Sequence, residues 1–133
     1  MSMLVESIMT PKEKLVIVSQ MDGLKVALQK MKEHGIKAVI VDKASPSGAY
    51  GLVTFKNVLQ SIVAEDGDID LLNAYDVAKS PVVSVSGKMD IKYAARMMVN
   101  NDIKRLLVID NNEIEGILTM SDIVGVLLDS IEN

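Results

Sequence analysis

The sequence contains no cysteine and a single histidine, and both shortages exclude chemistry. Without cysteine there can be no disulfide bond, no thiol nucleophile and no thiolate metal site. His34 precedes Gly35 at the expected end of a helix, where interaction with the helix dipole is the simpler interpretation. The Asp and Glu residues do not have the spacing of a calcium-binding loop. Nothing in the sequence suggests a nucleophile paired with a general base. We therefore predict no enzyme activity, no catalytic residue and no metal site.

Aromatic residues are scarce as well, with one Phe, three Tyr and no Trp. The core is therefore predicted to be aliphatic, with Met as filler. No apolar run approaches the roughly 18 residues that span a membrane, and no signal-peptide pattern is present. The net charge of −4 argues against a general nucleic-acid binder, which needs a basic face. We expect a cytoplasmic protein that binds neither membranes nor nucleic acid.

What the sequence does contain is an internal repeat. The stretch Gly51–Asn57 returns in similar form as Gly116–Asp122, and each copy is followed by an apolar run. Helical stripes with apolar residues at i, i+3, i+4 and i+7 begin at Leu24 and again at Ile91. Short β-branched runs precede and follow each stripe. The order strand–helix–strand–strand–helix therefore occurs twice, which predicts an α+β fold.

The repeats are expected at residues 1–66 and 67–133. Each is too small to bury a comfortable core alone, so the two should pack as a pair. Asp22 is predicted to cap the first helix and Gly35 to end it. The acidic segment Ala64–Asp70 is predicted to connect the repeats. The last helix is expected to carry its apolar residues on one face, namely Val124, Leu127, Leu128 and Ile131.

The stretch Thr119–Asp122 lies where a strand is expected to run into a helix. Unpaired backbone N–H groups and the helix dipole suit a phosphate at such a junction. Thr119 and Ser121 add hydroxyl groups, and the Asp122 carboxylate can accept hydrogen bonds from two ribose hydroxyls. The same residues also fit a purely structural role, with Ser121 as helix cap and Asp122 as a first-turn carboxylate. Lys104-Arg105 fits either a phosphate site or a solvated face.

On these residues the chain resembles a tandem pair of CBS (cystathionine β-synthase) domains, called a Bateman module. The resemblance rests on Ser7–Pro11, on the two helical stripes, on Ile36–Asp42 with Ile103–Asp110, and on the two junction stretches. It implies two intertwined β-α-β-β-α repeats related by a pseudo-twofold axis. It also implies a regulatory module that binds AMP, ADP, ATP or S-adenosylmethionine, forms homodimers through helices and acts on a partner protein.

The resemblance also implies which residues hold the adenosine nucleotide, a regulatory ligand and not a catalytic cofactor. The main site, at Asp122, would use Thr10, Ile36, Lys37, Ala38, Lys104, Arg105, Ile117, Thr119, Ser121 and Asp122. A second, weaker site would use Thr54, Asn57, Ser80 and Ile103. Asn57 stands where the family has Asp, and its amide lacks the charge that strengthens such hydrogen bonds. The alternative function is a ligand-free module for dimerisation.

Overall fold

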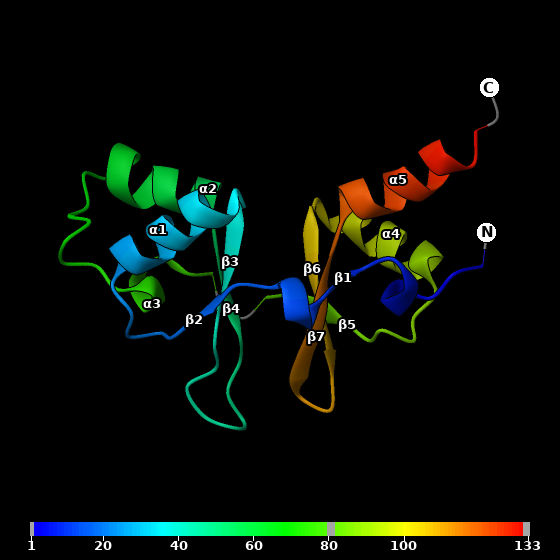
Figure 1. The fold of residues 1–133 in the computed structure, drawn as a ribbon, viewed down its shortest axis with the longest axis horizontal. Coiled ribbons are helices and arrows are strands. Elements are labelled where there is room, and N and C mark those ends of the chain that lie inside the picture. The colour runs from blue at the N-terminus through cyan, green and yellow to red at the C-terminus, as the bar shows by residue number, and fades with distance from the viewer. Residues whose placement is uncertain (1, 80–81, 132–133) are drawn as a thin grey trace. The chain divides into compact units, whose positions relative to one another are not determined.

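The computed structural model describes residues 2–79 and 82–131. Within these ranges it contains seven β-strands and five α-helices, which form two compact units (Figure 1). One unit is Val16–Val82, here called the central unit. The other joins Met1–Leu15 to Val83–Asn133 and is here called the terminal unit.

The central unit has a three-stranded sheet in the order β2-β3-β4. Helix α1 connects the parallel strands β2 and β3, and β4 runs antiparallel to β3. The helices lie on one face of this sheet (Figure 1). The bounds are β2 (Ile17–Val18), α1 (Leu24–His34), β3 (Ala38–Val41), β4 (Gly51–Thr54), α2 (Phe55–Val58), the π-helical stretch η3 (Leu59–Ala64) and α3 (Ala74–Val77).

The terminal unit has a four-stranded sheet in the order β1-β7-β6-β5. Strand β1 comes from the start of the chain and pairs antiparallel with β7, which places Thr10 opposite Ile117. The bounds are η1 (Val5–Ser7), β1 (Thr10–Pro11), η2 (Lys12–Lys14), β5 (Ser84–Val85), α4 (Ile91–Asn101), β6 (Arg105–Asp110), β7 (Glu113–Thr119) and α5 (Met120–Asp129).

Both cores are aliphatic, as predicted. The buried members of the predicted stripes all contribute, with Leu24, Ala27 and Met31 in one unit and Ile91, Ala94 and Met98 in the other. In each unit one helical stripe packs against inward-facing strand residues, which is the arrangement that an amphipathic helix on a half-buried sheet requires. Helix α1 ends at Gly35 as predicted, because this glycine adopts the left-handed conformation with φ +61°.

One local prediction needs correction, and one helix was not predicted. Asp22 does not cap α1, since Gly23 directly precedes the helix and the Asp22 carboxylate accepts from Ser19 N–H at 2.8 Å. The connector after Ala64 is followed by a helix, α3, that no periodicity in so short a segment could signal. Its residues Ala74 and Val77 belong to the buried core of the central unit.

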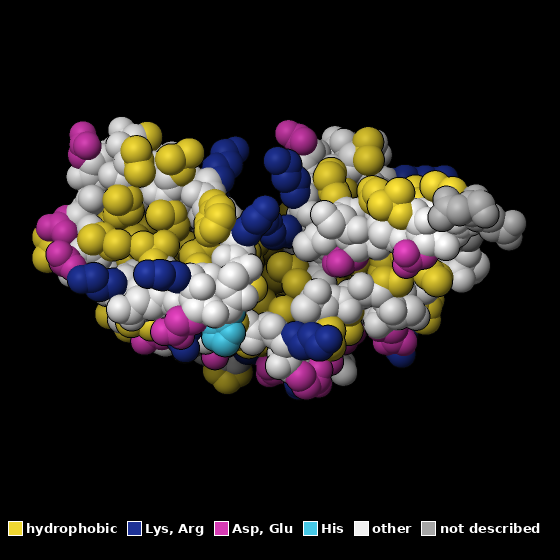
Figure 2. Space-filling model, turned by 45° about the horizontal axis from the view of Figure 1, so that its top comes forward, with side chains coloured by type: hydrophobic (Ala, Val, Ile, Leu, Met, Phe, Trp, Pro, Cys, Tyr) yellow, Lys and Arg dark blue, Asp and Glu magenta, His cyan; other side chains and the backbone are white. Residues whose placement is uncertain are grey.

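Helix α5 packs against a core only in part: Met120 and Ile123 contact the core of the terminal unit, whereas the residues predicted to share one face do not. All four predicted face residues are exposed, as are Phe55, Leu59 and Val63 in the α2–η3 segment of the other unit. Figure 2 shows patches of hydrophobic side chains on the surface of both units. In the η3 stretch, Ile62 packs against the core while Leu59 and Val63 do not. The face predicted for the last helix is therefore open to solvent, whereas the α2–η3 segment is partly packed against its core and partly exposed.

The mixed α+β class is confirmed, and so is the repeated order, as β2-α1-β3-β4-α2 and β5-α4-β6-β7-α5. The compact units do not follow the chain order of the repeats, because the first fifteen residues join the second half of the chain. In the part of the chain that the structure describes, no helix has both the length and the apolar character needed to cross a membrane.

Candidate functional site

The Thr119–Asp122 junction joins the end of β7 to the start of α5. The N–H group of Thr119 donates to Asp122 Oδ2 at 2.8 Å, and the N–H group of Asp122 donates to Thr119 Oγ1 at 3.1 Å. This reciprocal pair is a capping box, which satisfies two backbone donors that a helix start leaves free. Thr119 is therefore the helix cap, and the prediction that Ser121 caps the helix is wrong.

The capping box uses only part of the polar capacity of the junction. Among the described residues, none donates to Asp122 Oδ1, so this carboxylate oxygen is an available acceptor on a half-buried side chain. Ser121 lies one residue earlier and is exposed. The hydroxyl of Thr119 accepts one hydrogen bond and keeps its own proton for a further acceptor. The junction can thus accept a hydrogen bond at Asp122 Oδ1 and donate one from the Thr119 hydroxyl.

The terminal unit places several other predicted residues beside this junction. Arg105 pairs with Thr119 across β6 and β7, and the carbonyl of Lys104 accepts from Met120 N–H at 3.1 Å. On the next strand Thr10 pairs with Ile117. The backbone pairing therefore brings together one carboxylate, two cations and the hydroxyl groups at one end of a sheet. The predicted residues in this group are Thr10, Lys104, Arg105, Ile117, Thr119, Ser121 and Asp122.

The remaining predicted residues have other positions. Ile36, Lys37 and Ala38 belong to the central unit, where Ala38 pairs with Thr54. Thr54 and Asn57 lie in the central unit as well, whereas Ile103 lies in the terminal unit and packs against its core. Ser80 lies outside the described residues.

The Thr54–Asn57 junction is the counterpart in the central unit. It is also a capping box, with Thr54 N–H donating to Asn57 Oδ1 at 2.9 Å and Asn57 N–H donating to Thr54 Oγ1 at 3.3 Å. A third bond runs from the Thr54 hydroxyl to the same Oδ1 at 2.9 Å. Asn57 is only 7% exposed. Its amide oxygen is thus occupied by two donors, and only the NH₂ group of the amide is left to interact.

Sequence reasoning missed both capping boxes. The signal was present, because Thr is followed three residues later by Asp or Asn in each copy, and this is the spacing of a capping box. The Ser121 hydroxyl directly before Asp122 suggests a cap two residues after the actual cap, Thr119. No sequence signal indicates the third bond, from the Thr54 hydroxyl to Asn57 Oδ1, because it depends on side-chain conformations in the folded protein.

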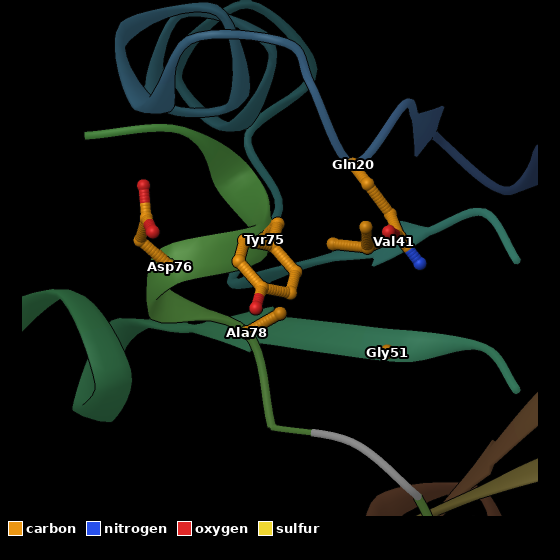
Figure 3. Close-up of a pocket in the computed structure, with 6 residues that line it drawn as sticks. All are labelled: Gln20, Val41, Gly51, Tyr75, Asp76 and Ala78. Carbon is orange, nitrogen blue, oxygen red and sulfur yellow. The ribbon is translucent and has the colours of Figure 1, made fainter. Parts of the chain in front are cut away.

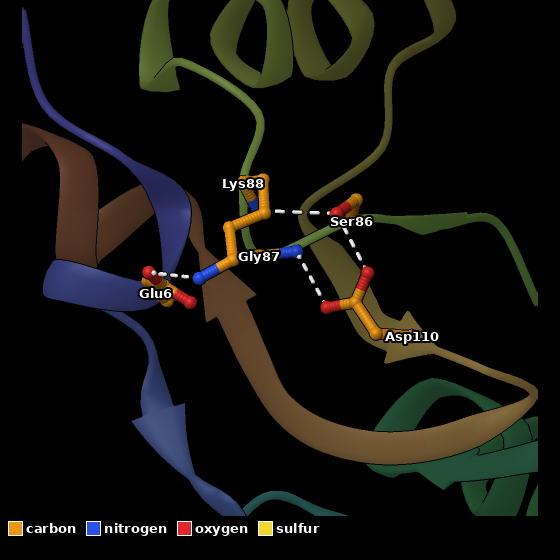
Figure 4. A network of polar contacts seen from close by, with 5 residues as sticks. All are labelled: Glu6, Ser86, Gly87, Lys88 and Asp110. Carbon is orange, nitrogen blue, oxygen red and sulfur yellow. Dashed lines mark hydrogen bonds and ion pairs between the residues drawn. The ribbon is translucent and has the colours of Figure 1, made fainter.

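Two further features lie away from these junctions. In the central unit a hollow of about 350 Å³ is lined by Gln20, Val41, Gly51, Tyr75, Asp76 and Ala78 (Figure 3). In the terminal unit a hollow of about 360 Å³ is lined by Glu6, Met9, Gly87, Lys88, Asp110, Asn111 and Glu115. A network of polar contacts at the second hollow ties the start of the chain to the loop before α4 (Figure 4).

Asp110 is the acceptor at the centre of this network. It accepts from the Ser86 hydroxyl at 2.6 Å and from Gly87 N–H at 3.1 Å, and these bonds hold the pKa of the Asp110 carboxyl below its usual value. The Lys88 ammonium lies 2.9 Å from Glu6, and the pKa of Lys88 is raised by that hydrogen bond and ion pair. The same network therefore anchors the segment that carries Thr10. In the described ranges no group of three or more potential metal ligands comes together.

Comparison with known proteins places the chain in a family. The family model described as CBS domain matches residues 5–64 and 74–129. The uncharacterized protein MK0525 of Methanopyrus kandleri is 34% identical over 100 residues, which cover 73% of this chain and 50% of that protein. The chain thus spans about half the length of this curated relative.

Solved structures show the same fold. The hexameric CBS-CP12 protein from bloom-forming cyanobacteria has a TM-score of 0.84 at 24% identity, over 98% of this chain and 76% of that one. CBSX2 in complex with AMP has a TM-score of 0.82 at 20% identity, over 97% of this chain and 99% of that one. A conserved protein from Pyrococcus horikoshii has a TM-score of 0.82 at 19% identity, over 98% of this chain and 96% of that one.

Proposed function

The chain belongs to the CBS domain family, and from this premise we propose that it is a regulatory sensor of adenosine nucleotides with its main site at the Thr119–Asp122 junction. The proposal involves no reaction. The nucleotide binds one conformation of the module more tightly than another and so shifts the population toward it. A partner protein responds to this change in conformation. The AMP bound to CBSX2, a protein of the same fold, supports the ligand class.

The residues beside the junction fit the chemistry of a nucleotide. The free Oδ1 of Asp122 accepts from the ribose hydroxyls, and a carboxylate makes such bonds stronger than a neutral group does. Lys104 and Arg105 bind phosphate oxygens, and the Thr119 and Ser121 hydroxyls donate to phosphate or ribose oxygens. Thr10 and Ile117 border the same end of the sheet. Ile36, Lys37 and Ala38 are assigned to the adenine on the family resemblance.

One observation carries the choice of main site. The two junctions have the same capping box, but Asp122 keeps a charged acceptor free whereas the single amide oxygen of Asn57 is used up by Thr54. A ribose diol needs an acceptor, so the Asn57 junction is the weaker site for a nucleoside. The predicted partners of that weaker site remain Thr54, Asn57, Ser80 and Ile103.

Calorimetric titration with AMP, ADP, ATP and S-adenosylmethionine tests the proposal. The sharpest variant is Asp122→Asn, because Asn57 demonstrates that asparagine can form the same capping box in this chain. We expect wild type to bind at least one of the four ligands. Asp122→Asn should bind it about tenfold more weakly, since a charged hydrogen bond contributes about 1.5–3 kcal/mol. Its melting temperature without ligand should remain close to that of wild type.

Two results would contradict the proposal. One is the absence of binding by wild type to all four ligands, and the other is equal affinity in Asp122→Asn and wild type. A large drop in the melting temperature of Asp122→Asn would show that the variant reports on folding. In that case the affinity of Lys104→Ala, which changes only an exposed side chain, decides the matter.

A second candidate function is a ligand-free dimerisation module. The exposed apolar residues favour it, because contiguous apolar surface on a small protein commonly marks an interface. They are Phe55, Leu59 and Val63 on α2–η3, and Val124, Leu127, Leu128 and Ile131 at α5. We propose that these helices form a homodimer whether or not nucleotide binds. Light scattering of wild type, Leu59→Glu and Leu128→Glu tests this, and a dimer that binds none of the four ligands favours the second function over the first.

A further inference from the structure

The hollow of the central unit lies at the opposite end of its sheet from the Thr54–Asn57 junction. Ala38 pairs with Thr54 at one end of the β3–β4 ladder, and Val41 pairs with Gly51 at the other. The hollow is lined by Val41 and Gly51, and by no residue of the junction. Its volume of about 350 Å³ is within the range of small-molecule sites, which begins at about 300 Å³. It is therefore a separate site.

Backbone hydrogen bonds hold the walls of this hollow in place. Tyr75 N–H donates to the carbonyl of Gln20 at 3.0 Å, which joins α3 to the loop before α1. Leu52 and Lys79 exchange two backbone hydrogen bonds of 3.1 and 3.0 Å, which fix the segment after α3 against β4. A hollow whose walls are fixed in this way does not have to be formed by its ligand, so little ordering cost accompanies binding.

The terminal unit builds a counterpart on the same backbone frame. Glu6 N–H donates to the carbonyl of Gly87 at 3.0 Å, as Tyr75 does to Gln20, and Val108 pairs with Gly116 as Val41 does with Gly51. There the Lys88 ammonium approaches Glu6 within 2.9 Å at the hollow, as Figure 4 shows. One of the two hollows thus receives an ammonium group from the chain itself.

The central hollow receives no such group. Met21 occupies the position equivalent to Lys88, one residue after Gln20, and its side chain is 72% exposed. Tyr75 occupies the position of Glu6. None of the six lining residues is cationic, and Asp76 adds a carboxylate. Its Oδ2 accepts from Asn73 N–H at 2.8 Å, and no described residue donates to its Oδ1. The central hollow therefore has the same backbone arrangement as the terminal one but lacks a counterpart of the Lys88 ammonium group.

The tyrosines show the same contrast. Lys43 Nζ lies over the ring of Tyr50 at 5.6 Å, and Lys92 and Arg96 lie over the ring of Tyr93 at 5.0 and 5.6 Å. Among the described residues no cation lies over Tyr75, although its side chain is 62% exposed. Figure 3 shows this ring at the hollow with its hydroxyl toward Ala78. It is the tyrosine whose ring is left for an external cation.

From the chemistry of these groups we propose that the central hollow binds a small organic cation, an ammonium group attached to an apolar body. The ammonium group binds over the face of Tyr75, and the carboxylate of Asp76, which also lines the hollow, attracts its charge. The apolar body packs on Val41, Gly51 and Ala78, and the Gln20 amide hydrogen-bonds a polar substituent. This site is independent of the nucleotide site, so either can fail without the other.

NMR titration of ¹⁵N-labelled protein with benzylammonium tests the proposal, with benzyl alcohol as the neutral probe of nearly the same shape. We expect shifts of the Gln20, Tyr75 and Ala78 amides with a Kd on the order of 1 mM, as befits so small a ligand. Benzyl alcohol should bind about tenfold more weakly. Tyr75→Leu and Asp76→Asn should each weaken benzylammonium binding about fivefold or more. Asp76→Asn keeps an oxygen for the Asn73 N–H group.

Tyr93→Leu is the matched control, since it removes an exposed tyrosine from the terminal unit and should leave the affinity unchanged. Equal affinity for benzylammonium and benzyl alcohol would overturn the proposal, as would the absence of shifts at these three amides up to about 20 mM ligand. Equal weakening by Tyr93→Leu would overturn it too. The melting temperatures of the variants verify that a loss of binding does not reflect unfolding.

Discussion

The two strand–helix junctions of this chain share one hydrogen-bond frame and differ in what the frame leaves free. Thr119 and Asp122 cap α5, and Thr54 and Asn57 cap α2 in the same reciprocal way. Asp122 is half-buried and keeps one carboxylate oxygen available, whereas Asn57 is buried with its amide oxygen occupied twice. A difference of one side-chain atom, oxygen against nitrogen, therefore changes an acceptor into a donor.

This comparison shows that a repeated motif can keep its structural role and lose its binding role. The capping box needs only one acceptor oxygen at the third helical position, and both Asp and Asn supply it. Ligand binding needs the second oxygen, which Asn does not have. The structural role is thus the more tolerant one, and a structural explanation of Asp122 does not exclude a functional one.

The largest effect is expected at the glycines that begin the two stretches. A Cβ atom at Gly116 would lie 2.5 Å from the carbonyl oxygen of Thr10 and 2.6 Å from Met9 Sδ, whereas at Gly51 the nearest atoms are 3.3 Å away. Gly116→Ala should therefore lower the free energy of unfolding by about 2–3 kcal/mol and Gly51→Ala by less than about 1 kcal/mol. Urea unfolding measures both, and equal losses would remove this difference between the units.

The second effect is expected from placing a charge in the buried junction. Asn57→Asp puts a carboxylate where the side chain is 7% exposed, so the free energy of unfolding at neutral pH should fall by about 2 kcal/mol. The loss should shrink as the pH is lowered and the carboxyl is protonated. The reciprocal variant Asp122→Asn should leave stability nearly unchanged. If both variants are equally stable, the two junctions differ less in burial than the structure indicates.

A third comparison concerns the capping threonines. Thr119→Ala should cost about 1 kcal/mol, the usual loss for a helix cap. Thr54→Ala should cost about 1.5 kcal/mol, because it also removes the hydroxyl that donates to the buried amide oxygen of Asn57. Thermal unfolding of the two variants side by side measures the difference. A larger loss for Thr119→Ala would contradict the assigned third hydrogen bond.

The smallest effect is expected at the network that anchors the N-terminal segment. The pKa of Asp110 is lower in the folded protein than its usual value, so its contribution is present above the usual pKa and is lost as pH falls through the lowered one. Asp110→Asn should cost about 0.5 kcal/mol at neutral pH, as an exposed charge interaction does, and less at low pH. Unfolding measured at pH 7 and at pH 3 tests this, and a pH-independent loss would contradict it.

Much of the fold was predictable because it depends on local pattern. The stripes beginning at Leu24 and Ile91 have the period of a helix, and Gly35 can adopt the left-handed conformation that ends one. The pairing of β6 with β7 follows from the tight turn at Asn111-Asn112, and that of β3 with β4 from the turn residues Ser45–Gly48 between apolar strands. Thr119 and Asp122 were singled out because a hydroxyl and a carboxylate at a helix start have recognisable chemistry.

Other features depended on contacts between distant parts of the chain. Strand β1 has only two residues, and its pairing with β7 depends on Gly116, which lets the backbone of Thr10 approach closely. Helix α3 has four residues, too few for a periodic signal, and forms because Ala74 and Val77 are buried. Val124, Leu127 and Leu128 were predicted to share one face of the last helix, but nothing in their spacing says whether a core or solvent faces them.

The sequence by itself determined that this chain is a repeated α+β structure with one complete and one altered junction. Composition, periodicity and the two related stretches are local properties, and each was legible residue by residue. Only the tertiary structure decided which oxygen of Asp122 is free, that the Asn57 amide oxygen is occupied, and that the chain start joins the second half. Those outcomes depend on burial and on long-range pairing, because a side chain's remaining hydrogen-bond capacity is known only when all its neighbours are in place.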